Sequence, residues 1–438
     1  MKQILKGLLG CFIIIVSILG INKILYYVLV DDTGDEVKYA IQELYKQENI
    51  ETLFLGSSHV MCGYIPEILD SGLNESIWLA TTPVQRIDGS YHLLKEVLKK
   101  NDIKKVYLDM YYRQYRGIPE ERTDDQMEYI YCITDNMNNS WNKVEFLLNA
   151  STNERYIESF FVPSRYGNYL LDLERFERII KSKRSEEYRM NKGPENFCKG
   201  TTIVSGVAGN PKMRGLIEEF SLARIGDNII SEYSLKYLDR MVELCKKEGI
   251  ELILVTTPFT YFHLAAMEDY TVYYEYMKEY ADRNQIEYYD FNLCNNKMLT
   301  LVDEDFLDIH HLSGKGAEKY TKVFVDFINN NDTEERREFF YNTVEEKLKD
   351  MPRQTYGIVY ELLDEEKGVY RVEAASNYPI EVEYRIVLLD SNGEEQEVIQ
   401  EFSENTLLKK REGTENCFKV TVREKNSHEI YEEWNVYL

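Results

Sequence analysis

Two short segments, far apart in the sequence, carry side chains that could together form a nucleophilic site. The first runs from Phe54 to His59 and holds Ser58 in a small-residue turn, directly after an apolar run with strand character. The second places Asp308 three residues before His311. A serine hydroxyl is inert at its own pKa, so it needs an imidazole to take its proton and an acceptor to fix the imidazole tautomer. We therefore predict Ser58 as the nucleophile, His311 as the base and Asp308 as the acceptor that orients His311.

Both segments resemble sequence blocks of the SGNH or GDSL-type esterases and acyltransferases. Residues 56–58, Gly-Ser-Ser, resemble the family's Gly-Asp-Ser block, whose third residue is the nucleophile, and this correspondence selects Ser58. The segment from Asp308 to His311 resembles the Asp-x-x-His block, and residues 312–316 resemble the helix start that follows it. Gly-Ser-Ser alone is a common turn, so the joint occurrence of both blocks in the right order favours the enzyme. The resemblance covers roughly residues 50–328 and implies serine-dependent acyl chemistry.

The resemblance also implies an oxyanion hole, and here the chain departs from the family. The family uses a glycine and an asparagine from two further blocks, which correspond to residues 77–83 and 106–112, and neither stretch contains the usual residue. The backbone amide of Ser58 and the amides or hydroxyls of Thr81 and Thr82 remain as candidate donors. Loss of one oxyanion donor lowers turnover by ~10²–10³. The sequence therefore predicts a slow or specialised enzyme and leaves open a surface protein that keeps the fold without catalysis.

Four other side chains near these segments are candidate substrate contacts. His59 is next to the nucleophile, His310 is next to the base, and Tyr111 and Arg113 follow the end of a predicted strand. A residue adjacent to a serine on a tight turn usually points away from it, so His311 is preferred to His59 as the base. Tyr111 and Arg113 could instead pack the following segment onto the sheet. We expect no metal and no cofactor, because no cluster of histidines and carboxylates has ligand spacing.

The N-terminal residues are apolar over a length that could cross a bilayer, which needs about 20 residues. Apolar runs at 7–21 and 24–30 are separated by Asn22 and Lys23, and Lys23 could reach the lipid–water boundary. No small-x-small cleavage site precedes Asp31, so an uncleaved anchor is favoured over a signal peptide. Lysines before the span and carboxylates after it predict an inside N-terminus and an extracytoplasmic remainder.

Composition limits the partners of this chain. Its 52 basic and 76 acidic residues give a net charge of −24, which argues against nucleic acid and against an anionic membrane surface as partners. Tyrosine is abundant at 35 residues, and tyrosines can stack on sugar rings, although most are expected in cores and interfaces. The seven cysteines occur singly, without metal or redox spacing.

A repeated helix-then-strand pattern predicts an α/β fold with a parallel sheet covered on both faces. The expected strands are at 52–55, 104–108 and 251–256, and Ser58 would lie beyond the carboxyl end of the first. The resemblance implies a three-layer, flavodoxin-like SGNH domain. Four parts are expected: a transmembrane anchor at 1–30, an SGNH-like domain at 31–330 with a helical insertion at about 111–225, a connecting helix at 331–351 and an antiparallel β-sandwich at 352–438.

These features predict a membrane-anchored serine enzyme that transfers or hydrolyses an ester-linked acyl group on a cell-surface polysaccharide or related polymer. Acetyl is the favoured acyl group. Anchor and fold together resemble proteins of teichoic-acid D-alanylation and of alginate or capsule O-acetylation, which act beside membrane-bound O-acyltransferases. The expected partners are therefore a surface glycan, the membrane and an O-acyltransferase. A plain extracellular esterase and a non-catalytic protein for polymer binding or complex assembly are the alternatives.

Overall fold

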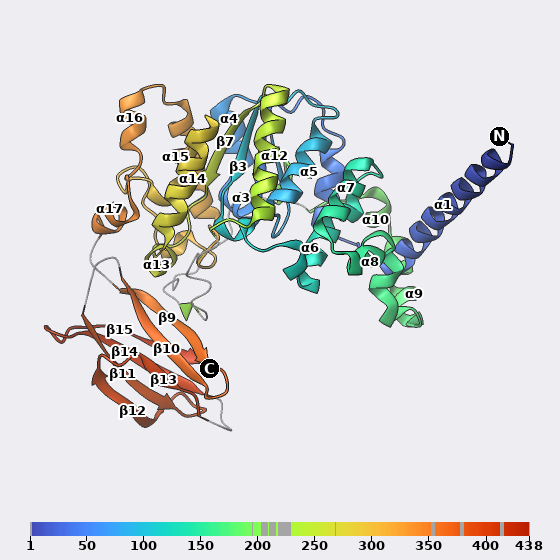
Figure 1. The fold of residues 1–438 in the computed structure, drawn as a ribbon. Coiled ribbons are helices and arrows are strands. Elements are labelled where there is room, and N and C mark those ends of the chain that lie inside the picture. Colours follow the sequence, from blue (N-terminus) through green and yellow to red (C-terminus); the bar gives the residue numbers. More distant parts are fainter. Residues whose placement is uncertain are drawn as a thin grey trace.

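A five-stranded parallel sheet organises the chain from residue 52 to residue 290 (Figure 1). Its strands are β1 (Thr52–Gly56), β2 (Ile77–Thr81), β3 (Lys105–Asp109), β7 (Glu251–Thr256) and β8 (Glu287–Asp290), in the spatial order β2-β1-β3-β7-β8. This is the flavodoxin-like order of a doubly wound sheet, so the predicted fold class is confirmed. The computed structural model describes residues 2–194, 196–202, 209, 216–217, 229–267, 269–351, 355–376, 381–411 and 416–437.

The sheet separates two apolar cores, because successive side chains of a strand point to opposite faces. Leu53 and Leu55 of β1 pack into one core, whereas Phe54 packs into the other. Helices α5, α12 and α14 cover the first face, and α3, α4 and α15 cover the second. Their bounds are α3 (Ser58–Gly63), α4 (Pro66–Leu73), α5 (Ile87–Val97), α12 (Glu232–Glu248), α14 (Tyr270–Asn284) and α15 (Gly314–Asn329). The layers are thus helix, sheet, helix.

A helical insertion follows β3 and leads back to α12. Its helices are η1 (Tyr112–Tyr115), η2 (Pro119–Glu121), α6 (Asp124–Asn136), α7 (Trp141–Ala150), η3 (Asn153–Arg155), α8 (Tyr156–Phe160), η4 (Val162–Tyr169), α9 (Leu173–Lys183) and α10 (Glu186–Met190). Short strands β4 (Phe197–Cys198), β5 (Thr201–Thr202) and β6 (Leu216–Ile217) come after them. Most of the predicted insertion beyond residue 202 lies outside the described residues.

Two helices precede the sheet. Helix α1 (Lys2–Leu29) is followed by α2 (Glu36–Leu44), which Asp35 caps by accepting a hydrogen bond from the Lys38 amide. The stretch Leu5–Leu29 of α1 is long and apolar enough to span a membrane or to act as a signal sequence. Figure 1 shows α1 projecting away from the sheet, with α8 and α9 beside its C-terminal end.

The C-terminal region is a β-sandwich, as predicted. Helices α16 (Thr333–Glu338) and α17 (Val344–Lys349) lead into it. One sheet has the order β13-β10-β9-β6, with β9 (Thr355–Asp364), β10 (Val369–Ser376) and β13 (Leu407–Lys409). The other has the order β12-β11-β14-β15, with β11 (Val382–Leu389), β12 (Glu395–Ser403), β14 (Cys417–Glu424) and β15 (Ile430–Tyr437).

Two contacts connect the sandwich to the rest of the chain in ways that the sequence did not predict. Strand β6, which comes from the insertion, pairs in parallel with β9. Helix α13 (Tyr261–Ala266), which follows β7, packs Phe262 and Ala266 against Val359 and Ala375 of the sandwich. The sandwich therefore lies against a helix that begins close to the carboxyl edge of the parallel sheet.

Candidate active site

Ser58 is presented by a sharp turn at the carboxyl end of β1. Strand β1 ends at Gly56, Ser57 is the N-cap of α3, and Ser58 is the first residue of that helix. A Cβ atom on Gly56 would lie 2.5 Å from the Cβ of Asp109 and 2.5 Å from Cγ2 of Val60. The turn therefore requires glycine, because no side chain fits between β3 and the first turn of α3.

Asp308 and His311 come from a closed loop that leads into α15. The Leu307 amide donates to the His311 carbonyl at 2.8 Å, and the Ser313 amide donates to the Asp305 carbonyl at 2.8 Å. Ser313 then caps α15 by accepting from the Gly316 amide. These bonds hold both ends of the loop, so its two functional side chains have a defined position.

The loop brings His311 to Ser58 across 253 residues of sequence. Oγ of Ser58 and Nε2 of His311 are 2.8 Å apart. Nδ1 of His311 and Oδ2 of Asp308 are also 2.8 Å apart. If Nδ1 carries the proton and donates to the carboxylate, Nε2 is free to accept the Ser58 proton. The three side chains predicted from the sequence thus lie together as a serine, histidine, aspartate relay.

Asp308 is held as a carboxylate. Partial burial alone would raise its pKa, but hydrogen bonds from the His311 ring and from the His310 and His311 amides lower the pKa to about 2. The two amides donate to Oδ1 at 2.8 and 2.9 Å, while Oδ2 faces the imidazole. The two carboxylate oxygens therefore differ in what they do, since Oδ1 fixes the side chain and Oδ2 orients His311.

Three further histidines surround the relay and are neutral. Burial, followed by nearby cationic groups including Arg113, lowers the pKa of His310 to about 3 and those of His59 and His263 well below the usual range. The rings of His263 and His310 lie 4.6 Å apart between centroids. Neutral imidazoles beside the relay can donate or accept hydrogen bonds without adding charge.

Tyrosines complete this cluster. The ring of Tyr111 stacks on His59 at 3.7 Å between centroids, and its hydroxyl lies 3.0 Å from Nδ1 of His310. The hydroxyl of Tyr112 lies 3.3 Å from Nε2 of His263. His263 was not predicted as a site residue. The only sequence signal for His263 is its position shortly after β7, on the edge where Ser58 lies.

The predicted substrate contacts differ in how accessible they are. His59 and Tyr111 are buried, with 3% and 4% of their surfaces exposed, so they pack beneath the site and are not positioned to contact a substrate directly. His59 does not point away from the site as expected, since its ring centroid is 5.1 Å from that of His311. His310 and Arg113 are partly exposed and remain available to a substrate.

The predicted oxyanion side is built from unusual residues. Thr81 ends β2 opposite Gly56, and its buried hydroxyl has no hydrogen-bond partner among the described residues. The hydroxyl of Thr82 is 3.1 Å from Oε1 of Gln85 and donates to it, so this hydroxyl is committed to the turn. Val84 has a φ of 52°, a left-handed conformation that favours glycine and strains a β-branched residue.

Asp109 lies at the end of β3, behind the nucleophile turn. Burial raises its pKa to about 8, opposed by the nearby amides of Thr257 and Tyr111. Neither carboxyl oxygen has a partner with hydrogen-bonding geometry among the described residues. Asp109 is therefore mostly protonated near neutral pH. Within the described ranges, no group of three or more histidine, cysteine or carboxylate side chains is placed to hold a metal ion.

Fold and site together define a class: an α/β protein with a serine, histidine, aspartate relay at the carboxyl edge of a parallel sheet. A family model whose description names no function matches residues 221–333. No curated protein matches the chain. A crystal structure of a candidate acylhydrolase from Bacteroides fragilis NCTC 9343 is similar over 68% of this chain and 98% of its own, with 13% sequence identity and a TM-score of 0.30. A likeness this low shows nothing about function. Any functional conclusion therefore rests on the geometry of the site.

Proposed function

We propose that this chain is a serine-dependent enzyme that transfers or hydrolyses an ester-linked acyl group through an acyl-serine intermediate. One observation carries the proposal: the relay in which His311 lies 2.8 Å from both Ser58 and Asp308. A serine hydroxyl with a neighbouring oriented imidazole is the arrangement that nucleophilic acyl chemistry needs.

In the first half of the reaction, Oγ of Ser58 attacks the acyl carbonyl carbon while Nε2 of His311 takes the hydroxyl proton. Asp308 stabilises the imidazolium that forms. The tetrahedral oxyanion is held by the Ser58 amide, which lies in the first turn of α3 where amides lack an intrahelical acceptor. The intermediate collapses to acyl-Ser58, and His311 returns its proton to the leaving alkoxide.

In the second half, a hydroxyl group attacks the acyl-serine carbonyl carbon and His311 accepts its proton; the acyl–Oγ bond then breaks, and His311 returns the proton to Oγ of Ser58. Water as the acceptor gives an esterase, and a sugar hydroxyl gives a transferase. The resemblance to proteins of polysaccharide O-acetylation favours acetyl transfer to a cell-surface polymer, with a membrane-bound O-acyltransferase as the source of the acyl group.

Helix α1 supports a position of the enzyme at a membrane. The span Leu5–Leu29 supports a membrane anchor, and Lys2 and Lys6 at its start support an inside N-terminus. The catalytic region then lies outside the membrane, where a surface polymer is accessible.

A non-catalytic role in polymer binding or assembly is the second candidate. The oxyanion side favours it, because the Thr82 hydroxyl is already engaged by Gln85 and residues 106–112 contain no asparagine. Such a protein would keep the relay without turning over an ester.

Trapping the intermediate tests the proposal. The full chain in detergent is mixed with an activated acetyl ester, quenched in acid and digested, and the acetylated peptide is located by mass spectrometry. We expect one acetyl group on Ser58, released faster when a sugar acceptor is added to a transferase. Ser57→Ala is the matched control that keeps the adduct, and Ser58→Ala loses it. Ester turnover that is equal in Ser58→Ala and the unaltered chain would contradict the proposal.

A further inference from the structure

The insertion carries large apolar side chains that its own core does not cover. In α8, Ile157 is 70% exposed and Phe160 is 39% exposed. Leu171, between η4 and α9, is 92% exposed beside the half-exposed Leu170, and Leu173, the first residue of α9, is 75% exposed. Exposed apolar groups that gather in neighbouring elements usually mark an interaction surface rather than free surface. We call residues 155–192, which contain them, the juxtamembrane segment.

This segment is bonded to helix α1. The side chain of Asn22 accepts a hydrogen bond from the Val162 amide at 3.0 Å and donates to the Phe160 carbonyl at 3.3 Å. Further along α1, the Arg175 guanidinium donates to the Leu29 carbonyl at 3.2 Å. The two apolar stretches therefore belong to elements that are attached directly to the C-terminal third of α1.

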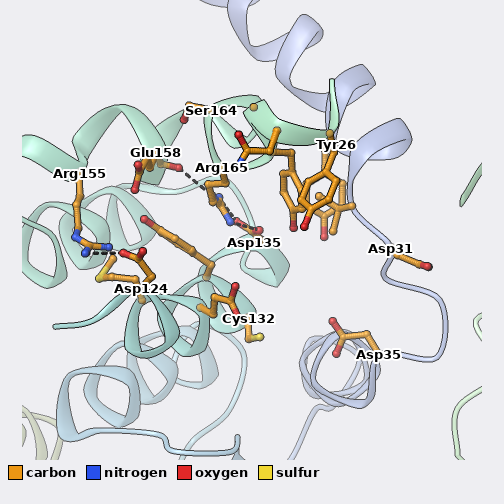
Figure 2. A pocket seen from close by; sticks show the side chains of 18 of the residues that line it. Tyr26, Asp31, Asp35, Asp124, Cys132, Asp135, Arg155, Glu158, Ser164 and Arg165 are labelled. Atoms are coloured by element: carbon orange, nitrogen blue, oxygen red, sulfur yellow. Dashed lines mark hydrogen bonds and ion pairs between the residues drawn. The ribbon is translucent and has the colours of Figure 1, made fainter. Parts of the chain in front are cut away.

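A polar cavity of about 670 Å³ is lined by residues of α1, α6, α8 and η4 (Figure 2). Tyr26 of α1 lines it together with Arg165, which binds Asp135 through two hydrogen bonds of 2.8 Å. Arg155 pairs with Asp124 on the same wall. Arg155 and Arg165 are thus paired within the cavity, and the cavity lining does not include the exposed apolar side chains of the segment.

The length of α1 indicates how deep in a bilayer its contacts with the juxtamembrane segment would lie. From Leu5 to Asn22 the helix rises about 26 Å, close to the ~30 Å thickness of a bilayer hydrocarbon core. If Leu5 lies at the inner boundary, Asn22 lies near the outer boundary. The bonds from Asn22 then place Phe160 and Val162 at the lipid–water boundary too.

The charge of the segment is compatible with that position. Residues 155–192 contain nine basic and six acidic side chains, in a chain whose net charge is −24. The rest of the chain is repelled by an anionic bilayer surface, but this segment is not. Arg178, Lys181 and Arg184 of α9 and its C-terminus are exposed and can reach lipid phosphates.

We propose that the juxtamembrane segment lies on the bilayer leaflet from which α1 emerges, with its exposed apolar side chains in the headgroup and upper acyl region. The inference rests on the proposed anchor, because without a spanning α1 the segment would not reach lipid. Two attachments, a spanning helix and an interfacial surface, would fix the orientation of the parallel sheet and its site relative to the membrane.

Lipid crosslinking in the full chain tests this inference. The chain is reconstituted alone into nanodiscs that contain a phospholipid with a diazirine in its acyl chain, irradiated, and digested for mass spectrometry. We expect adducts both in residues 5–29 and in residues 157–173. Peptides with Leu407 and Ile430, which are 51% and 56% exposed in the sandwich, serve as internal controls and should carry none.

A pair of variants makes the result specific. Leu171→Glu/Leu173→Glu changes two highly exposed side chains, so the melting temperature should be unchanged while the adducts in 157–173 are lost and those in α1 remain. Leu407→Glu/Ile430→Glu should change neither set. Adducts confined to α1 would overturn the inference, keep the anchor and point to a protein partner or water at this surface. Adducts in neither region would overturn the anchor and the inference together.

Discussion

The site has two halves, which differ in how completely their polar side chains are hydrogen-bonded. The half that activates the nucleophile, formed by Ser58, Asp308 and His311, has two contacts of 2.8 Å and a loop closed at both ends. The half that should hold the oxyanion, at the ends of β2 and β3, has Thr81 with no hydroxyl partner among the described residues and a protonated Asp109. Proton transfer and oxyanion binding thus depend on different parts of the fold. The residues for one function can therefore be retained while those for the other change.

The difference has a physical origin. The relay depends on one turn and one loop, both stabilised by local backbone hydrogen bonds. The oxyanion side depends on donors converging from three strands, and a hydroxyl or a backbone amide can replace an amide side chain there. We therefore expect large effects from substitutions in the first half and smaller, separable effects in the second.

The largest effect is expected for Asp308→Asn. The asparagine amide cannot stabilise the imidazolium and favours the wrong tautomer, so kcat/KM should fall by ~10²–10⁴ in a protein that still folds. The pKa of Asp308 is lowered to about 2, so its contribution to stability is present above its unfolded pKa and lost only as the pH falls toward about 2. The acid limb of a pH–rate profile above about pH 4 should therefore not come from this carboxyl. Activity within twofold of the unaltered chain would show that the relay does not operate.

The next comparison separates the two threonines of the oxyanion side. Thr81→Val removes a buried hydroxyl that has no partner among the described residues, and if that hydroxyl binds the oxyanion, kcat should fall by ~10–10² with KM unchanged. Thr82→Val instead leaves Gln85 without its donor, so it should cost about 1 kcal/mol of stability with a smaller loss of kcat. Steady-state kinetics and denaturant melts on both variants measure the contrast. Equal kinetic effects would mean that the Thr81 hydroxyl has no special role.

Asp109→Asn should change the pH dependence of stability. The pKa of Asp109 is raised by burial to about 8, so the folded state holds a proton that the unfolded state has already lost. Stability should therefore be greatest below the unfolded pKa and fall as the pH rises toward 8, by up to ~1.4 kcal/mol per pH unit. The neutral asparagine removes this slope. Unfolding curves from about pH 5 to 8 check it, and an unchanged slope would indicate that the carboxyl is ionised throughout.

The smallest effect is expected at Val84. Its φ of 52° strains a β-branched side chain, so Val84→Gly should raise the free energy of unfolding by about 1 kcal/mol. If this strain holds the amides near Thr81 and Thr82 in position, kcat should fall by a few-fold at the same time. Denaturant melts and kinetics on one preparation give both values, with Gly393→Ala as a control turn far from the site. A stability gain without any kinetic change would show that the strain at Val84 does not position the amides near Thr81 and Thr82.

Sequence reasoning recovered the parts of the structure that local patterns specify. The strands at 52–55 and 251–256 were predicted within one residue of β1 and β7, because apolar runs and turn signals fix them. Ser58, Asp308 and His311 were found because a nucleophile turn and a base loop each have a local signature. The expected parallel sheet was enough to predict that Ser58 lies beyond the carboxyl end of the first strand.

Other parts depend on contacts that no local pattern encodes. The burial of His59 under Tyr111, the placement of His263 beside His310 and the strain at Val84 arise only when separate elements pack. The pairing of β6 with β9 is similar, because two residues of an insertion add to a sheet far along the chain. Residue spacing and composition therefore cannot predict these features.

If Ser58 is an activated nucleophile, it should react with a fluorophosphonate. The full chain is treated with the reagent, and the modified residue is located by mass spectrometry in the unaltered protein, in Ser58→Ala and in His311→Ala. We expect labelling at Ser58 that is lost in Ser58→Ala and at least ~10²-fold slower in His311→Ala. A folded protein that remains unlabelled, or that labels equally fast without His311, would contradict the account and favour the non-catalytic alternative.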